Sequence, residues 1–147
     1  MLNSSREYSR SYSCLKKSLA FLLFIAGAAQ ADDYVVTSAA DSGFGSLRSA
    51  IASANSNPGA DSITFNLPFG TNTIAPASPL PALSDATGGT TINGTGDVIL
   101  DGDSAGICSG LALSSDDNVI HGLIIIRFSS AGLAISGGGN IVRACVV

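Results

Sequence analysis

The sequence predicts an all-β fold, a parallel β-solenoid closed at its N-terminal end by a short amphipathic helix, on three observations. First, residues 110–125 repeat at 132–147, with five of sixteen aligned pairs identical and five more exchanging one aliphatic residue for another. Second, short β-branched runs alternate with turns of Ser, Gly, Asp and Asn at a period in the low twenties, a pattern typical of β-solenoids. Third, one helical pattern stands among strands near residue 50, where an open solenoid end needs a cover.

Residues 1–31 have the composition of an export signal. A basic segment (6–17) precedes an apolar run (19–28), and a small-x-small site ends at Ala31, directly before Asp32. An apolar run of ten residues is too short for a membrane-spanning helix, which needs about 20. We therefore expect a cleavable signal peptide whose membrane contact is transient, and a mature chain that begins at Asp32 and is secreted or held at the cell surface.

The charge of the predicted mature chain limits its partners. Residues 32–147 carry ten Asp, no Glu, no Lys and three Arg, a formal net charge of −7. A nucleic-acid-binding protein would show a basic patch, so nucleic acid is excluded as a partner. Asp without Glu is typical of turns, because the short Asp side chain bonds to its own backbone two residues later.

The two cysteines of the mature chain show no metal-site pattern. Cys108 and Cys145 form no CxxC pair and no Cys/His cluster, so neither a zinc site nor another cofactor is predicted. Cys145 aligns with Leu123 in the repeat, which favours a small buried side chain. A disulfide between the two cysteines is the alternative, since an exported protein permits one.

Residues 32–89 are expected to form an N-terminal cap that starts with a strand at 34–37. A turn cluster at 41–45 then leads to Ser46, whose hydroxyl is suited to cap a helix. The apolar positions of this helix follow the i, i+3, i+4, i+7 pattern and are Leu47, Ala50, Ile51 and Ala54.

After this helix, the pattern returns to strands and loops. Asn-Pro-Gly at 57–59 ends the helix, and residues 63–67 alternate as a half-covered strand does. The prolines between 76 and 81 leave room only for a short strand near 73–74, because proline lacks the amide that a ladder needs.

Residues 90–147 are expected to be the coils of the solenoid. Strands are predicted at 90–93, 98–100, 111–113, 119–126, 133–135 and 141–147. Coils stack about 4.8 Å apart, so each strand pairs in parallel with its equivalent in the next coil. Residues 100–102 are expected to be equivalent to 120–122 in the next coil, 20 residues later, so the length of a coil varies. Because the sequence stops inside an apolar run, we expect a truncated piece of a longer protein.

Asn118 and Asn140 occupy equivalent positions in the repeat. A side-chain amide has donors and an acceptor, so stacked asparagines can bond along the solenoid axis. The alternative is two ordinary turn asparagines.

The segment DSGFGSLRSAI (41–51), followed by an Ala-Asn pair and the strand ITFNLP (63–68), resembles the N-terminal domain named for its Cys-Ser-Leu-Arg-Glu-Ala (CSLREA) motif. This chain has Gly45 where the motif has Cys and Ser49 where it has Glu, and the resemblance covers roughly 34–102. It implies export, mostly in bacteria, and a right-handed parallel β-helix of the pectin-lyase-like fold. It implies no activity.

Five residues within and directly after this motif are expected to have structural roles. They are Ser46, Leu47, Arg48, Ala50 and Ile51. Arg48 is expected to anchor the capping helix.

The related fold of pectate lyases makes acidic and basic residues candidates for catalysis. Two acidic pairs, Asp101/Asp103 and Asp116/Asp117, offer the oxygen ligands that calcium prefers. The second repeat has glycines at 138–139 in place of Asp116 and Asp117, which favours ordinary turns.

The basic residues His121 and Arg127 also lack the sequence context of a catalytic base. His121 is the only histidine, and its equivalent is Arg143, which indicates a solvated outward face. Arg127 at the end of a strand resembles a lyase-type base, but the sequence shows no acidic constellation fixed beside it.

We therefore expect a non-catalytic, exported scaffold or adhesin-like segment whose parallel face binds extracellular glycans or a host or neighbouring cell surface. The alternative is the N-terminal part of a pectate-lyase-like polysaccharide lyase or hydrolase whose active residues lie beyond Val147. Within residues 32–147 the sequence predicts no catalytic, cofactor-binding or metal-binding residue.

Overall fold

The computed structural model describes residues 29–147. All but the last three residues of the predicted signal peptide fall at positions 1–28, so that prediction lies outside the described residues. Within the described part, no helix is both long and apolar enough to cross a membrane.

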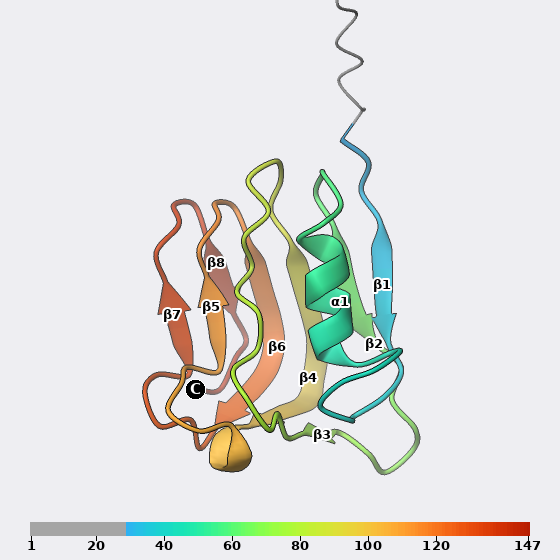
Figure 1. Cartoon of the computed structure of the whole chain (residues 1–147), viewed down its shortest axis with the longest axis vertical. Helices are drawn as coiled ribbons and strands as arrows, with labels where there is room; N and C mark the ends of the chain where they lie inside the picture. Colours follow the sequence, from blue (N-terminus) through green and yellow to red (C-terminus); the bar gives the residue numbers. More distant parts are fainter. Residues whose placement is uncertain (1–28) are drawn as a thin grey trace, which may run out of the picture.

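The fold is a parallel β-solenoid with one short helix near its N-terminal end, which confirms the predicted fold class (Figure 1). In chain order the elements are β1 (Asp33–Val36), α1 (Leu47–Ala54), β2 (Ser62–Phe65), β3 (Thr73–Ile74), β4 (Thr91–Asp101), a 3-10 turn (Gly102–Ser104), β5 (Leu111–Leu113), β6 (Val119–Ile126), β7 (Leu133–Ile135) and β8 (Ile141–Arg143). The main sheet has the order β1-β2-β4-β6-β8, with β3 beside β4, and β5 pairs with β7. All pairings are parallel, and the four steps along the main sheet make about four turns.

The strand register reproduces the sequence repeat. Leu111 pairs with Leu133 and Val119 with Ile141, as the alignment of 110–125 with 132–147 predicts. The bridge between Ile124 and Val146 continues the same alignment. The repeat therefore identifies residues that lie on one another in adjacent coils.

The predicted equivalence of 100–102 with 120–122 is wrong. Leu100 pairs with Ile125, whereas it is Ile92, near the start of the same strand, that pairs with Ile120. The two separately predicted strands at 90–93 and 98–100 are one strand, β4, which carries three more residues than β6 between these pairs. The extra residues form an irregularity in β4. Because of it, the number of residues between paired positions of β4 and β6 differs on its two sides.

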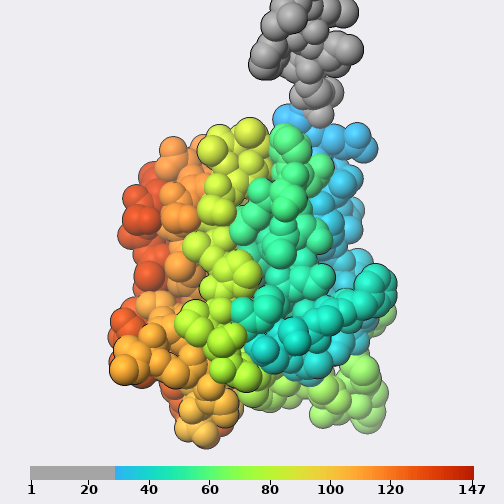
Figure 2. Space-filling model, viewed as in Figure 1, coloured from blue at the N-terminus to red at the C-terminus, as the bar shows by residue number. Residues whose placement is uncertain are grey.

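Aliphatic side chains stack inside the coils and form the core. Ile63, Ile92 and Ile120 pair in register across β2, β4 and β6, and all three are fully buried. Burying a side chain of this size contributes about 1.5–3 kcal/mol. This stack crosses the predicted boundary at residues 89 and 90 without a break, and Figure 2 shows the coils as adjoining bands.

The helix α1 covers the first coils with its apolar side. Leu47, Ala50, Ile51 and Ala54 are buried in the same core cluster. Ser46 Oγ accepts from the backbone N of Ser49 at 3.2 Å, the contact of a helix N-cap. At the other end, Asn55 donates to Ala82 O at 2.7 Å and accepts from Ser84 N at 2.8 Å, so the helix is tied to the following loop.

Candidate functional site

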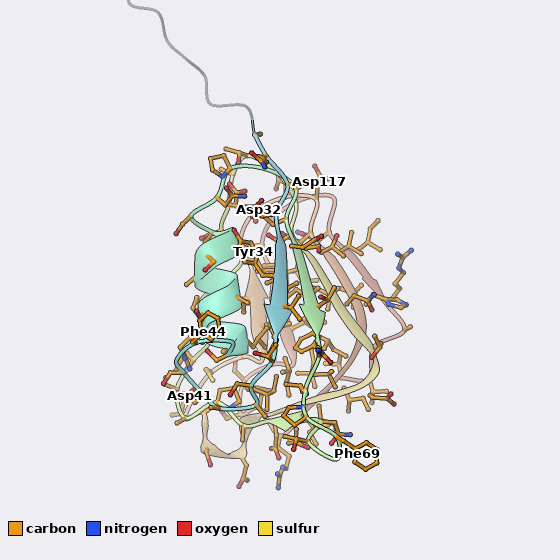
Figure 3. All side chains as sticks on the ribbon, turned by 90° about the vertical axis from the view of Figure 1, so that its right-hand side faces the viewer. Asp32, Tyr34, Asp41, Phe44, Phe69 and Asp117 are labelled. Carbon is orange, nitrogen blue, oxygen red and sulfur yellow. The ribbon has the colours of Figure 1, made fainter. Side chains whose placement is uncertain are left out.

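Two phenylalanine side chains are fully exposed and project from turns on different sides of the molecule (Figure 3). Phe44 precedes α1, whereas Phe69 lies in the loop between β2 and β3. An exposed aromatic ring is a large apolar surface that the fold itself does not use. Each ring borders a cleft with polar groups, of about 220 Å³ at Phe44 and about 390 Å³ at Phe69. Phe69 is the more informative of the two, because its cleft is larger and contains a second phenylalanine, Phe65.

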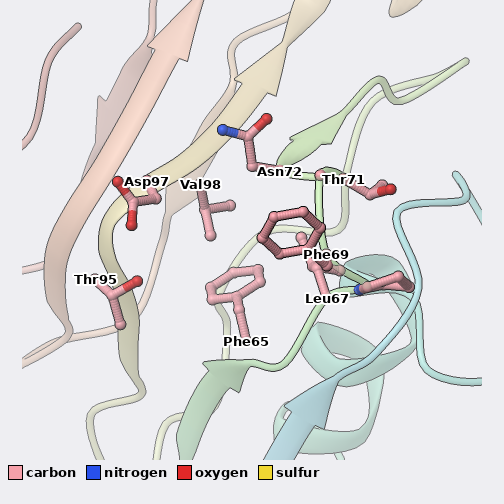
Figure 4. A pocket seen from close by; sticks show the side chains of 10 residues that line it. Phe65, Leu67, Phe69, Thr71, Asn72, Thr95, Asp97 and Val98 are labelled. Atoms are coloured by element: carbon pink, nitrogen blue, oxygen red, sulfur yellow. The ribbon is translucent and has the colours of Figure 1, made fainter.

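This cleft has a volume of about 390 Å³ and lies between the β2–β3 loop and β4 (Figure 4). Phe65, Leu67 and Phe69 are large apolar side chains of its lining, and Figure 4 shows the rings of Phe65 and Phe69 bordering the same space. Asn72, Thr95 and Asp97 contribute polar groups to the same cleft. The cleft thus combines apolar side chains with a larger share of polar surface.

A tight turn presents Phe69. The backbone N of Thr71 donates to Pro68 O at 2.9 Å, and Gly70 has a φ of +77°, a value that residues with a Cβ rarely adopt. Phe65, at the end of β2, instead packs against the core. One ring of the cleft is therefore fixed by the core, and the other is held over solvent by a turn.

The irregularity in β4 places the polar wall. Thr95 and Gly96 both have positive φ, +57° and +95°, and Asn93 Oδ1 accepts from the backbone N of Thr95 at 3.1 Å. Such bulges redirect side chains relative to a regular strand. The exposed residue Asp97 follows directly and lines the same cleft.

The chemistry of the cleft suits a neutral, polyhydroxylated ligand. Phenyl faces carry partial negative charge and attract the C–H groups of a sugar ring. Amide, hydroxyl and carboxyl groups from Asn72, Thr95 and Asp97 are suited to bond sugar hydroxyls. The only ionisable side chain in the lining is acidic, which opposes an anionic ligand.

A row of outward side chains crosses the main sheet. The register aligns Val35, Thr64, Asn93, His121 and Arg143 on five successive strands. His121 Nδ1 lies 3.2 Å from Asn93 Oδ1, and Arg143 is exposed. Apart from the apolar Val35, the row is polar and at least partly exposed. The equivalence of His121 with Arg143 agrees with this outward position.

Arg127 is paired with the carboxylate of Asp101. Its Nε donates to Asp101 Oδ1 at 2.7 Å, and its second nitrogen bonds Asp101 Oδ2, so the pair is bidentate. Asp101 ends β4 while Arg127 follows β6, one coil away, and the changed register of these two strands brings them together. Hydrogen bonding to Asp101 raises the pKa of Arg127 above its usual value. This is the wrong direction for a proton-abstracting base.

The side chain of Arg48 makes several hydrogen bonds outside its own helix. Its guanidinium donates to Asp41 Oδ1 at 2.6 Å, Ser78 O at 2.8 Å and Pro79 O at 2.6 Å. Asp41 Oδ1 also accepts from Ala77 N at 3.1 Å. Arg48 thus fastens α1 to the proline-rich loop, and its bond lowers the pKa of the Asp41 carboxyl group.

Asn118 is fully buried and bonds along the solenoid axis. Its Nδ2 donates to Asn140 Oδ1 at 2.8 Å and to Ser115 O at 2.9 Å, while its Oδ1 accepts from Thr90 N at 2.9 Å. These contacts leave no free position for a ligand, so the side chain serves the fold.

The remaining candidates do not come together. Cys108 and Cys145 are free thiols. Within residues 29–147 no three His, Cys, Asp or Glu side chains converge as a metal site would require. Ala31 and Asp32 are both exposed, and the backbone N of Asp32 bonds Asp61 Oδ1 at 2.8 Å.

Sequence reasoning missed the cleft itself. Its one sequence signal is an aromatic residue inside a Pro-Phe-Gly turn, at Phe69, because a turn exposes its central side chain. Asp97 could not have been assigned, since it lies next to the irregularity in β4. In the comparisons with known proteins, no family model, no curated protein and no solved structure matches this chain.

Proposed function

We propose that this protein is an exported, non-catalytic scaffold that binds neutral glycans in the cleft between the β2–β3 loop and β4. In this proposal residues 1–31 are a cleavable signal peptide and the mature chain is secreted or held at the cell surface. The N-terminal region is a divergent CSLREA-type domain that leads into a right-handed β-helix. The partners are extracellular glycans or the glycan surface of a host or neighbouring cell.

The observation that carries the proposal is the fully exposed ring of Phe69 beside the core-packed ring of Phe65, with Asp97 in the same cleft. An isolated exposed aromatic residue would need no explanation. Two rings that share a cleft with hydroxyl, amide and carboxyl groups match both the apolar faces and the polar edges of a sugar.

Charge favours neutral over acidic glycans. The chain from residue 32 onward has a formal net charge of −7, and the cleft adds the carboxyl group of Asp97 without a basic neighbour in its lining. A polyuronate would meet repulsion both at a distance and in the cleft. The same charges count against the pectate-lyase alternative, which requires an acidic substrate and a base, whereas Arg127 is held protonated by Asp101.

The test is isothermal titration calorimetry of the exported protein with cellohexaose and xylohexaose, and with oligogalacturonate as the acidic comparison. We expect a neutral oligosaccharide to bind and Phe69→Ala to weaken that binding at least tenfold. Phe44→Ala is the matched control, because both rings are fully exposed and neither truncation removes core contacts. Equal effects of the two variants, or no binding of either neutral glycan, would contradict the proposal. New unsaturated chain ends from polygalacturonate would favour the lyase.

A further inference from the structure

Asp61 has a buried carboxyl group whose hydrogen bonding is incomplete. The residue is only 1% exposed. Its Oδ1 accepts from the backbone N of Asp32 at 2.8 Å and from Asn57 Nδ2 at 2.9 Å, whereas its Oδ2 has no partner among the described residues. A buried carboxyl oxygen without a donor is unfavourable, and such groups in folded proteins call for an explanation.

The backbone N that bonds Asp61 belongs to the first residue after the expected cleavage site. In the uncut chain this nitrogen is a peptide N–H with one hydrogen, which Oδ1 uses. Hydrolysis of the Ala31–Asp32 bond by a signal peptidase consumes one water. Ala31 leaves with a new carboxylate, and Asp32 keeps the nitrogen as an α-ammonium with three N–H donors.

We propose that removal of the export signal seats the new α-ammonium of Asp32 on the carboxyl group of Asp61. It there supplies the missing donor to Oδ2 and fastens the first strand of the solenoid. A donor group 2.8 Å from one carboxyl oxygen is within reach of the other, so only a small shift is required. The inference rests on the proposed export and on cleavage before Asp32.

The surroundings of this position are acidic. Asp32 and Asp33 are the first residues of the new terminus, and Asp85 Oδ2 accepts from the backbone N of Gly59 in the adjoining loop. Tyr34 has a pKa raised first by burial and then by the charges of Asp61 and Asp32. No Arg or His side chain of the described residues forms an ion pair with Asp61. The Asp61 carboxyl group therefore has no cationic partner among the described side chains, and cleavage would supply one, the α-ammonium of Asp32.

Cleavage also removes contacts on the leader side. Gln30 N donates to Pro58 O at 2.8 Å, and Gln30 O accepts from Asn57 Nδ2 at 2.8 Å. Both bonds leave with the signal, while the bond from Asn57 to Asp61 stays. Ala31 and Asp32 are exposed, so a protease has access to the peptide bond between them. The processed chain exchanges two exposed bonds for one ion pair at a buried group.

The chain offers a clean probe of this ion pair. Residues 32–147 contain no lysine, so after cleavage the α-amino group is the only primary amine in the protein. An α-amino group has an ordinary pKa of about 7.7–8.0, and a paired carboxylate raises it. Because only the neutral amine reacts with acylating reagents, pairing slows acetylation at neutral pH.

The experiment first determines the N-terminal residue of the exported protein by mass spectrometry and then acetylates it at pH 7 with the N-hydroxysuccinimide ester of acetic acid. We expect the folded protein to react at least tenfold more slowly than the same protein in urea. Asp61→Asn should restore fast reaction in the folded state. Asp33→Asn is the matched control and should stay slow, because it removes a neighbouring carboxyl group that bonds Ser62 instead.

The outcomes separate the two proposals. An exported protein that begins at another residue, or remains uncut, contradicts the proposed processing. A protein that begins at Asp32 but reacts equally fast when folded and unfolded overturns the contact with Asp61 alone. If Asp61→Asn does not fold, the comparison of folded with unfolded wild type still decides, because it needs no variant.

Discussion

The side-chain amide of Asn118 donates to Oδ1 of Asn140 at 2.8 Å, although the two residues are 22 positions apart. The same Oδ1 accepts from the backbone N of Asn118 at 2.8 Å, and Asn118 Oδ1 accepts from Thr90 N at 2.9 Å in the preceding coil. One buried side chain thus bonds the coil before it and the coil after it. Because a slip by one residue would break all of these bonds together, the ladder fixes the register of three coils.

Asn118→Ala should therefore destabilise the protein strongly. It leaves the backbone N of Thr90 without its acceptor in a buried position, and each such unpaired group costs about 1–3 kcal/mol. We expect a loss of about 2–4 kcal/mol in the free energy of unfolding, measured by urea titration. Asn66→Ala is the control and should cost little, because Asn66 is exposed and lies outside the ladder. A loss for Asn118→Ala no larger than for the control would contradict the ladder.

The ion pair between Asp101 and Arg127 should make stability depend on pH. Hydrogen bonding from Arg127 lowers the pKa of the Asp101 carboxyl group. A carboxyl group with a lowered pKa stabilises the fold above its unfolded pKa of about 3.9, and this contribution is lost as pH falls through the folded value. The Tm of the wild type should thus be higher than that of Arg127→Gln at pH 5–7, and this difference in Tm should disappear toward pH 2. Arg143→Gln, which removes an exposed arginine from the polar row, should show no such difference at any pH.

The sequence predicts those parts of the fold that the spacing of apolar residues and the positions of turn residues determine. The repeat places Leu111 on Leu133 and Val119 on Ile141, because stacked coils bring like residues together. The same reasoning failed at Leu100, since the irregularity after Asn93 adds residues to one strand and not to its neighbour. A repeat predicts stacking only where both coils have the same length.

The candidate site was less predictable because its groups depend on several loops at once. Arg127 and Asp101 lie 26 residues apart, an offset that differs from that of the repeat, so alignment of the repeats does not pair them. Asp61 likewise gave no signal, because a buried aspartate and a turn aspartate have the same local sequence. Arg48 was easier to interpret, since it lies on the helix that the pattern identified, and its bonds to Ser78 O and Pro79 O join that helix to the following loop.

Gly89 and Gly138 should respond very differently to alanine. Neither has a positive φ, but a Cβ on Gly89 would lie 1.9 Å from Asp117 O, whereas one on Gly138 would meet its nearest atom at an ordinary 3.7 Å. Gly89→Ala must move the backbone of the adjoining coil and should cost about 2 kcal/mol or more. Gly138→Ala should change the free energy of unfolding by less than about 0.5 kcal/mol, as surface substitutions do. Similar values for both in urea unfolding would show that the coils do not approach as closely as described.

Arg48→Lys should loosen the proline-rich loop even though it keeps the positive charge. The planar guanidinium bonds Asp41, Ser78 and Pro79 at once, which a single ammonium group cannot reproduce. We expect the amide of Ala77, which donates to Asp41 Oδ1, to exchange its hydrogen at least tenfold faster in this variant. Amides of β6 serve as the internal control. Unchanged exchange at Ala77 would mean that charge alone holds the loop.

Asp97 should determine how tightly the cleft holds a neutral glycan. It is exposed, so Asp97→Ala removes a hydrogen-bond acceptor without disturbing the core, and a hydrogen bond to a charged group contributes about 1.5–3 kcal/mol. Because 1.4 kcal/mol corresponds to about a factor of ten, binding of the neutral oligosaccharide should weaken roughly 10- to 100-fold in calorimetry. Asp97→Asn keeps an acceptor oxygen and should lose less, while it admits oligogalacturonate more readily because the repelling charge is gone. The control is Asp103→Ala, because Asp103 is also exposed but lies outside the cleft, and this variant should leave both affinities unchanged. If it weakens binding as much as Asp97→Ala does, the net charge of the protein and not the cleft governs binding.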